Sequence, residues 1–304
     1  MKKKTLLFFI VLFFAGLSCK KEFSFRFAAG FEGGTYYKIG QSLNSIPGFK
    51  FEVQKTDGSL DNILRLAANK ADFSLTQLDM LQNYAIGEPD IKGKVKILMP
   101  LYGEEVHLLA KKSIQNLQDL KGKTISIGPS DSGIKISSLI FLSQIGLKEE
   151  DIKLEEFKTE KALAMLVEGK LDAVVIIAGA PVKALSDLDK SVGNKIHLLE
   201  FAEGLYQSVR GTNLMYQKAE IPAGMYSWQE KSIRTLLVQS VLISRAEIDI
   251  PTIEEFVDNI FSNQISLGSQ HSKWKGLNKK QVKLYFEKSP DLYHPAMKKI
   301  ISNF

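Results

Sequence analysis

The stretch "AAGFEGGTYYKIG", residues 28–40, decides the fold class. It follows "FSFRFAA" (residues 23–29), whose alternation of apolar and polar side chains is typical of a strand. It leads into "YYKIGQSLNSI", where Tyr36, Ile39 and Leu43 recur at helical spacing and Pro47-Gly48 ends the pattern. A strand that enters a helix through a glycine turn leaves backbone N–H groups free for an anion. The turn lacks lysine, so it suits a carboxylate held by neutral donors.

Strand and helix patterns alternate over most of the chain. Two further strands, residues 49–56 and 71–79, flank a helix that we expect Ser59 to cap, with Leu60, Ile63, Leu64 and Ala67 as its apolar stripe. The alternation resumes at residue 124 and continues to residue 201. This order predicts an α/β fold with parallel sheets covered by helices. We expect residues 232–248 to be part strand and part helix, and a helical segment from Pro251 to cover the first lobe.

An internal echo suggests two similar α/β lobes. "ANKADFSLTQ" (68–77) and "EGKLDAVVII" (168–177) each join a helix end, a lysine, an aspartate and a strand. The glycine turn at Gly34 has a counterpart at Ser132-Gly133, at nearly the same offset. A match this short also arises by chance, so the shared strand–turn–helix order carries the prediction.

Composition is that of a folded protein of 304 residues, 44% apolar and 24% charged. The net charge of +6 includes Lys2, Lys3 and Lys4, and is about +3 without them. No basic stripe with interleaved aromatics is present, so we expect no nucleic-acid partner. We also expect a monomer.

The first 19 residues have the pattern of a secretion signal. "MKKK" precedes a 12-residue apolar run, residues 6–17, and then "GLSC" with Cys19, the one cysteine of the chain. The run is shorter than the roughly 20 residues of a membrane span. The position of Cys19 resembles a bacterial lipoprotein signal, cleaved before a lipidated cysteine, although Gly16 stands where leucine is usual. A plain cleaved signal or a short anchor is the alternative.

Four turns fall where parallel strands end, which is where ligands bind in open α/β sheets. They cover residues 30–36, 56–59, 76–79 and 128–133, and each offers backbone N–H groups or small hydroxyls. We expect three of them to open a helix. Taken singly, each turn also fits simple capping and a tight bend. Their occurrence in both lobes favours a ligand cleft between the lobes.

The motifs of common enzymes are missing. "GPSDS" has Ser132 in place of the second glycine of G-x-S-x-G, and no phosphate-loop or dinucleotide motif occurs. The four histidines show no metal spacing, so we expect no metal, no cofactor, no catalytic residue and no enzyme. His107 and His197 are interpreted as core residues. We expect Asp72 and Asp172 to cap or turn, and Glu104-Glu105 to be exposed and structural.

Several segments together resemble the TAXI family, the solute-binding subunits of TRAP (tripartite ATP-independent periplasmic) transporters. They are "GGTYYKIGQSL", "TDGSLDNILRLAANKADFSLTQLD", "LYGEEVHLLAKKS", "LQDLKGKTISIGPSDSG" and "LVEGKLDAVVIIAGAP". A late "HPAM" is similar to a family His-Pro-Gly-Ala motif, with Ala296 in place of glycine. The resemblance covers nearly all of the chain after the signal.

The resemblance implies a type II periplasmic-binding fold with a ligand cleft between two lobes. Lobe 1 would comprise residues 23–105 and 240–304, and lobe 2 residues 106–239. The function implied is binding of a small organic acid, glutamate-like or dicarboxylate-like, outside the cytoplasm and its delivery to a TRAP permease. The ligand-binding residues implied are Gly34, Thr35, Tyr36, Ser59 and Gln77 from lobe 1, and Ser132, Gly133, Gly179 and Ala180 from lobe 2.

Other functions on the same fold stay open. The domain would equally serve an ABC importer or a membrane sensor. Tyr36 either stacks on the ligand or packs. The acid Glu32 beside an anion site suggests an amino acid whose ammonium needs a partner, a role that Asp79 or Asp131 would also fit.

Overall fold

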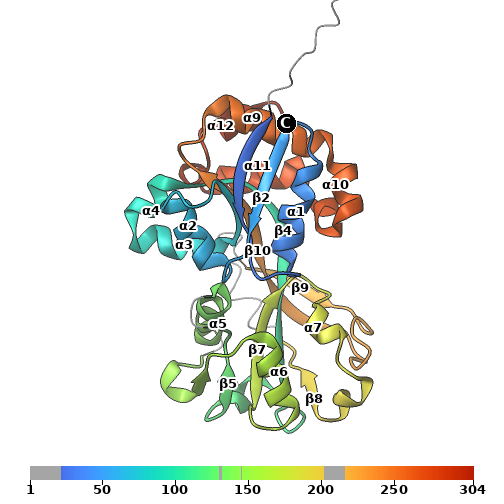
Figure 1. Cartoon of the computed structure of the whole chain (residues 1–304). Helices are drawn as coiled ribbons and strands as arrows, with labels where there is room; N and C mark the ends of the chain where they lie inside the picture. Colours follow the sequence, from blue (N-terminus) through green and yellow to red (C-terminus); the bar gives the residue numbers. More distant parts are fainter. Residues whose placement is uncertain (1–21, 130–131, 145, 202–215) are drawn as a thin grey trace, which may run out of the picture.

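The computed structural model describes residues 22–129, 132–144, 146–201 and 216–304. The signal segment with Cys19, and Asp131, lie outside the described residues. Within them the chain forms an upper and a lower lobe joined at a narrow waist (Figure 1). No helix of the described residues is long and apolar enough to cross a membrane.

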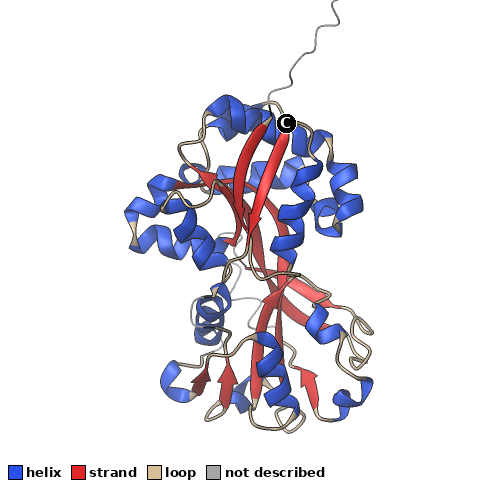
Figure 2. Cartoon of the chain, viewed as in Figure 1, coloured by secondary structure: helices blue, strands red, loops and turns tan. Residues whose placement is uncertain are grey.

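A single mixed sheet runs through both lobes (Figure 2). Its main path has the order β2-β1-β3-β10-β4-β7-β5-β6, with β8 beside β4 and β9 beside β10. The strands are β1 (Phe23–Ala28), β2 (Phe49–Gln54), β3 (Phe73–Gln77), β4 (Val95–Lys111), β5 (Thr124–Ser126), β6 (Lys153–Glu155), β7 (Ala173–Ala178), β8 (Ile196–Leu198), β9 (Tyr216–Ile221) and β10 (Ile233–Arg245).

Helices pack around this sheet in both lobes. The α-helices are α1 (Thr35–Ser42), α2 (Ser59–Ala67), α3 (Leu78–Gly87), α4 (Pro89–Lys94), α5 (Gly133–Gln144), α6 (Thr159–Val167), α7 (Lys183–Ser186), α9 (Ile250–Ser262), α10 (Gln264–Gln270), α11 (Lys279–Lys288) and α12 (Ala296–Ser302). The 3₁₀ turns are η1 (Leu43–Ser45), η2 (Leu117–Leu120), η3 (Glu149–Asp151), η4 (Lys190–Asn194), η6 (Ser272–Gly276) and η7 (Pro290–Leu292).

The hydrophobic core is divided between the lobes. One buried cluster joins β1, β2 and β3 to helices α9, α11 and α12, so the C-terminal helices do cover the first lobe. Two other clusters fill the opposite side of the waist, around β5, β7 and β9. We call the elements of the first cluster lobe 1 and those of the other two lobe 2.

The two segments of the internal echo make the same pair of backbone contacts in the structure. The Asp72 carboxylate accepts the N–H of Arg26 on β1, and the N–H of Asp72 donates to the Arg26 carbonyl. Asp172 makes the same reciprocal pair with Thr124 on β5. Both aspartates also bind cations: Asp72 binds Arg26 and Arg245, and Asp172 binds Lys111. Each therefore joins the start of its strand to the neighbouring strand, in addition to the turn that we expected.

The expectation of parallel sheets holds only for the outer strands. β1 pairs in parallel with β2 and β3, as β5 does with β6 and β7. Between the two groups, β4 and β10 run antiparallel to each other over both lobes. Residues 233–245 are strand throughout, so the predicted helical part is wrong, because an apolar run buried on both faces reads alike for either element.

The prediction for α2 is wrong in two details. Gly58, with a φ of 107°, is the N-cap, and Ser59 is the first helical residue without a capping bond. The buried face includes Ile63 and Leu66, whereas Leu64 is 44% exposed. Ser59 is thereby free to use its hydroxyl toward the next strand end.

Candidate functional site

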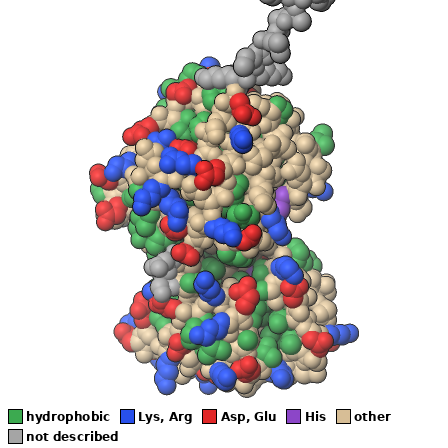
Figure 3. Space-filling view, in the orientation of Figure 1, with side chains coloured by type: hydrophobic (Ala, Val, Ile, Leu, Met, Phe, Trp, Pro, Cys, Tyr) green, Lys and Arg blue, Asp and Glu red, His purple; other side chains and the backbone are tan. Residues whose placement is uncertain are grey.

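Polar side chains from both lobes are buried together at the waist. We call this group the interlobe cluster. Seven of its members lie in lobe 1 or on the crossing strands β4 and β10, and two come from lobe 2. The members are Tyr36, Ser59, Gln77, Asp79, Tyr102, Glu104, Ser137, Tyr216 and Ser240. Figure 3 shows the molecule narrowing at this level.

Helix starts position the lobe 1 members. The Ser59 hydroxyl, at the start of α2, accepts the N–H of Gln77 at 3.1 Å. The Tyr36 hydroxyl, from the first turn of α1, lies 3.4 Å from the Ser59 oxygen and 3.5 Å from that of Ser240. Gln77 is the N-cap of α3, so all four predicted turns open a helix, one more than expected. The sequence therefore located Tyr36, Ser59 and Gln77 next to one another.

Glu104 is the centre of the cluster. It is 4% exposed and lies on β4 where the strand passes from one lobe to the other. Gln77 Nε2 donates to one carboxylate oxygen at 2.9 Å, and the Tyr102 hydroxyl donates to the other at 3.1 Å. The expectation of an exposed structural role for Glu104 is wrong. β4 passes between the two lobes at Glu104, and the spacing of the neighbouring residues does not show that both lobes enclose the strand there.

Asp79 joins the lobes directly. On α3, its Oδ2 accepts the Ser137 hydroxyl of α5 at 2.5 Å and the Tyr216 hydroxyl of β9 at 2.7 Å, both from lobe 2. Its Oδ1 accepts the N–H of Met80. Asp79 is 2% exposed, so these donors replace water around its charge.

Gly133, the first residue of α5, brings lobe 2 against the cluster. A Cβ at this position would lie 2.5 Å from Gln77 Oε1 and 2.7 Å from Ser59 Cβ, so only glycine permits the approach. Its neighbour Ser132 donates to the Pro129 carbonyl at 2.7 Å and accepts the N–H of Lys135. The Ser132 hydroxyl therefore closes its own turn.

Gly179 and Ala180 form a separate contact between the lobes. The Ala180 N–H donates to Glu105 at 2.7 Å, and Lys273 Nζ, from lobe 1, donates to the Ala180 carbonyl at 2.9 Å. A Cβ on Gly179 would lie 2.7 Å from Lys273 Cε and 3.0 Å from the Tyr102 ring. Tyr102, a member of the interlobe cluster, therefore also borders this contact.

Gly34 and Thr35, the two residues before Tyr36, lie at the edge of the interlobe cluster. Gly34 is the N-cap of α1, and its N–H donates to the Phe31 carbonyl at 3.1 Å. Thr35 is half-buried. Glu32 is exposed and paired with Lys55, so its charge points away from the site.

Burial governs the electrostatics of the site. Burial raises the pKa of Glu104 from 4.5 to about 7, and the charge of Asp79 also raises it. Hydrogen bonds from Tyr36, Gln77 and Tyr102 lower the pKa but do not offset burial. Burial also raises the pKa of Asp79, with Ser137 and Tyr216 opposing it. Neither acid has an ion pair within the described residues.

The structure adds Tyr102, Glu104, Ser137, Tyr216 and Ser240 to the residues that sequence reasoning proposed, and it places Asp79, which the sequence had suggested as a partner for an ammonium group, among them. Asp79 lay in a predicted turn, which was a usable signal. Glu104 gave one too, because an acid within the apolar run of residues 95–111 needs a partner. Ser137 and Ser240 lie in apolar segments and carry no such signal.

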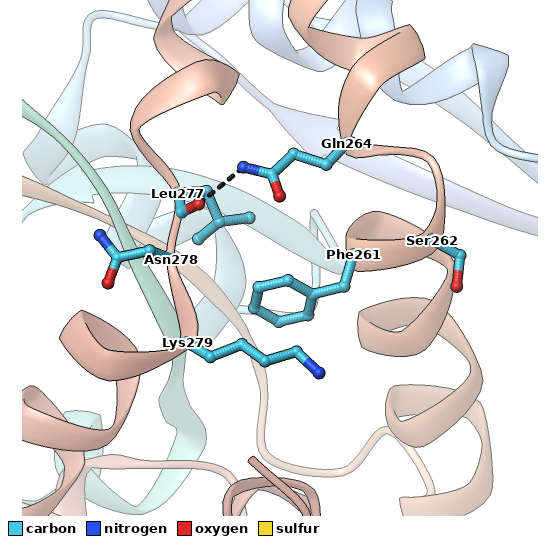
Figure 4. Close-up of a pocket in the computed structure, with 6 residues that line it drawn as sticks. All are labelled: Phe261, Ser262, Gln264, Leu277, Asn278 and Lys279. Atoms are coloured by element: carbon cyan, nitrogen blue, oxygen red, sulfur yellow. Dashed lines mark hydrogen bonds between the residues drawn. The ribbon is translucent and has the colours of Figure 1, made fainter.

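The described residues give few other candidates. No group of three or more His, Cys, Asp or Glu among them lies close enough to hold a metal. His107 is buried and bonded to Tyr226 and to the Glu105 carbonyl, which confirms its place in the core. A surface hollow of about 430 Å³ lies among the C-terminal helices of lobe 1 (Figure 4). There Gln264 Nε2 donates to the Leu277 carbonyl at 2.6 Å, so part of its polar lining is already satisfied.

Solved structures share this architecture. A putative L-cystine ABC transporter protein from Listeria monocytogenes gives a TM-score of 0.52 at 13% identity, covering 89% of this chain and 100% of that one. The GluR0 ligand-binding core of Nostoc punctiforme, in complex with L-glutamate, gives 0.51 at 14%, covering 82% and 98%. The aliphatic sulphonate binding protein SsuA of Escherichia coli gives 0.51 at 15%, covering 92% and 78%. The fold is thus that of type II periplasmic binding proteins.

One further match is partial. The chain spans 43% of the length of the periplasmic domain of BvgS from Bordetella pertussis, at a TM-score of 0.49. The sequence itself matches the NMT1-like family over residues 27–299, which is most of its length. The chain therefore belongs to the NMT1-like family.

Proposed function

We propose that the protein is an extracytoplasmic solute receptor that binds a small organic acid or amino acid between its lobes. The single observation that carries the proposal is the interlobe cluster. Burying so many polar side chains between two separately packed lobes is costly unless each finds a partner. A bound solute would exchange partners with these groups and hold the lobes together.

The proposed site combines residues that the sequence predicted with one that the structure revealed. From the sequence it takes Gly34, Thr35, Tyr36, Ser59, Gln77, Asp79, Ser132, Gly133, Gly179 and Ala180, and from the structure it takes Glu104. Helix starts at α1, α2 and α5 offer N–H groups for a carboxylate. We infer that the solute leaves unchanged, which is supported by the similarity to solved structures of solute-binding and ligand-binding proteins. We infer that the protein is not an enzyme.

We propose further that a TRAP permease receives the solute and that a lipid on Cys19 anchors the protein to a bacterial membrane, outside the cytoplasm. The family resemblance of the turns supports the first proposal and the signal pattern supports the second. The lobe boundaries that we propose are residues 23–105 with 240–304, and 106–239. Delivery to an ABC importer is the second candidate, favoured by the similarity to the cystine transporter protein.

A melting experiment tests solute binding. The protein, expressed from its full-length gene, is unfolded and refolded to remove bound solute, and its melting temperature is measured with single organic acids and amino acids. A solute at 100 times its dissociation constant should add about 2.7 kcal/mol to the free energy of unfolding. If no compound of either class raises the melting temperature, the proposal fails.

Co-purification distinguishes the transporters. The protein is crosslinked in its own membranes with solute present, and the attached membrane proteins are identified. A multi-span permease without an ATPase supports a TRAP system, and an ATPase-linked permease supports the ABC alternative.

A further inference from the structure

Glu104 has no cationic partner in the part of the chain that the structure describes. Its donors are the Gln77 amide and the Tyr102 hydroxyl, both neutral, and the nearby Tyr36 is neutral too. A carboxylate removed from water favours a cation over neutral donors.

Asp79, the second acid of the cluster, is already occupied. Both of its oxygens accept hydrogen bonds, from Met80 on one side and from Ser137 and Tyr216 on the other. Lys273, on the far side of Tyr102, donates to the Ala180 carbonyl, and its Nζ lies 5.4 Å from the Tyr102 ring centre. Both Glu104 oxygens also accept hydrogen bonds, but their donors, Gln77 and Tyr102, do not come from lobe 2. A solute that takes their place leaves the bonds of Asp79 between the lobes intact, so Glu104 is the acid that we assign to the solute.

The Gln77 amide shows what the space beside Glu104 accepts. Its N–H₂ end donates to Glu104, while its oxygen accepts the Ser137 hydroxyl at 3.3 Å and packs against Gly133 at the start of α5. A donor thus faces the acid, and an acceptor faces a helix N-terminus, within one small planar group. An α-amino acid has the same arrangement, with its ammonium and its carboxylate on one carbon.

We propose that the solute is an α-amino acid, or a zwitterion like one, whose ammonium binds Glu104 and whose carboxylate faces the start of α5. This rests on the proposed function and specifies the solute class of the same site. The Gln77 amide gives way to the solute on binding. The Tyr36 and Tyr102 rings beside Glu104 add cation–π attraction for the ammonium.

Matched probes test the proposal by calorimetry on the full protein. Each amino acid is paired with the acid that lacks only its amino group: L-glutamate with glutarate, L-alanine with propionate, and so on through the common amino acids. The wild type should bind at least one amino acid 10-fold or more tightly than its partner. Glu104→Gln should weaken that binding at least 100-fold and leave the affinity for the partner acid equal or higher.

The control is Glu52→Gln, which removes an exposed acid of lobe 1 and should leave both affinities unchanged. Should Glu104→Gln fail to fold, the wild type alone decides. Its affinity for the amino acid should rise several-fold from pH 6 to pH 8, as Glu104 loses its proton, whereas that for the partner acid should not. The other titratable groups facing Glu104 are Asp79, Tyr36 and Tyr102.

The outcomes separate the two proposals. A wild type that binds only acids without an amino group, or a Glu104→Gln variant that weakens both probes equally, overturns the assignment of Glu104 and leaves the receptor function standing. Binding of neither class would overturn both.

Discussion

The Ser137 hydroxyl donates to the Asp79 carboxylate at 2.5 Å, from a helix of lobe 2 to a helix of lobe 1. Ser137 is fully buried and Asp79 nearly so. A hydrogen bond to a charged group contributes about 1.5–3 kcal/mol. This one exists only while the lobes are together, so its free energy stabilises the closed arrangement directly.

Removing that bond should open the protein. Ser137→Ala leaves Asp79 with one lobe 2 donor, Tyr216, and we expect a larger radius of gyration by small-angle X-ray scattering and a lower melting temperature. Ser138→Ala is the matched control: Ser138 is equally buried on the same helix, and its oxygen has no partner within the described residues. Equal effects of the two substitutions would mean that the Asp79 contact does not hold the lobes.

Gly133→Ala should block closure. The added Cβ would lie 2.5 Å from Gln77 Oε1 and 2.7 Å from Ser59 Cβ, closer than real side chains pack. We expect the dissociation constant of the solute to rise 10-fold or more, while far-ultraviolet circular dichroism stays unchanged. Gly93→Ala is the control, because a Cβ there meets nothing within 4 Å and Gly93 also lies in a helix. Unchanged affinity in Gly133→Ala would show that the solute binds without this approach.

Glu104 should give the unliganded protein a characteristic pH dependence. Its pKa is raised from 4.5 to about 7, so the folded state holds a proton that the unfolded state has lost. The resulting destabilisation is complete above pH 7 and absent below pH 4.5. A shift of this size corresponds to about 3 kcal/mol.

The difference between two proteins isolates this effect. His107, whose pKa burial lowers to about 4, acts oppositely and costs stability as the pH falls from 6.5 to 4. It is present in both wild type and Glu104→Gln, so it cancels. Measured by urea unfolding, the free energy of Glu104→Gln relative to wild type should be about 3 kcal/mol higher at pH 8 than at pH 5. A constant difference across this range would refute the raised pKa.

The lipid anchor is tested at the signal. Cys19→Ala should move the protein from the membrane fraction to the soluble extracytoplasmic fraction and abolish incorporation of labelled fatty acid. Ser18→Ala, one residue earlier, keeps the cysteine and should leave both readouts unchanged. Membrane retention of Cys19→Ala in the absence of solute would exclude lipidation as the anchor.

Sequence reasoning found the parts of the site that local patterns encode. Tyr36, Ser59 and Gln77 each stand where a strand gives way to a helix, and such junctions can be located from glycines and apolar spacing. Gly133 was predicted because the same strand-to-helix junction recurs in the second lobe. These four residues meet in the structure.

The residues that were missed depend on contacts distant in sequence. Glu104 is buried beside Tyr36 and Gln77, which come from other elements earlier in the chain, and its strand pairs with β10, more than 130 residues later. The same pairing explains why residues 232–248 were misread, since an inner strand between two others has no alternating pattern. Local spacing carries no information about such a pairing.

The path of the chain through β4 and β10 also sets an order of assembly during synthesis. The polypeptide leaves lobe 1 along β4, completes lobe 2, and returns along β10 to supply α9, α11 and α12. As the chain emerges with its N-terminus first, lobe 1 must therefore wait with part of its apolar surface uncovered until the last helices follow. A chain that stops short of them would carry a finished lobe 2 attached to an unfinished neighbour.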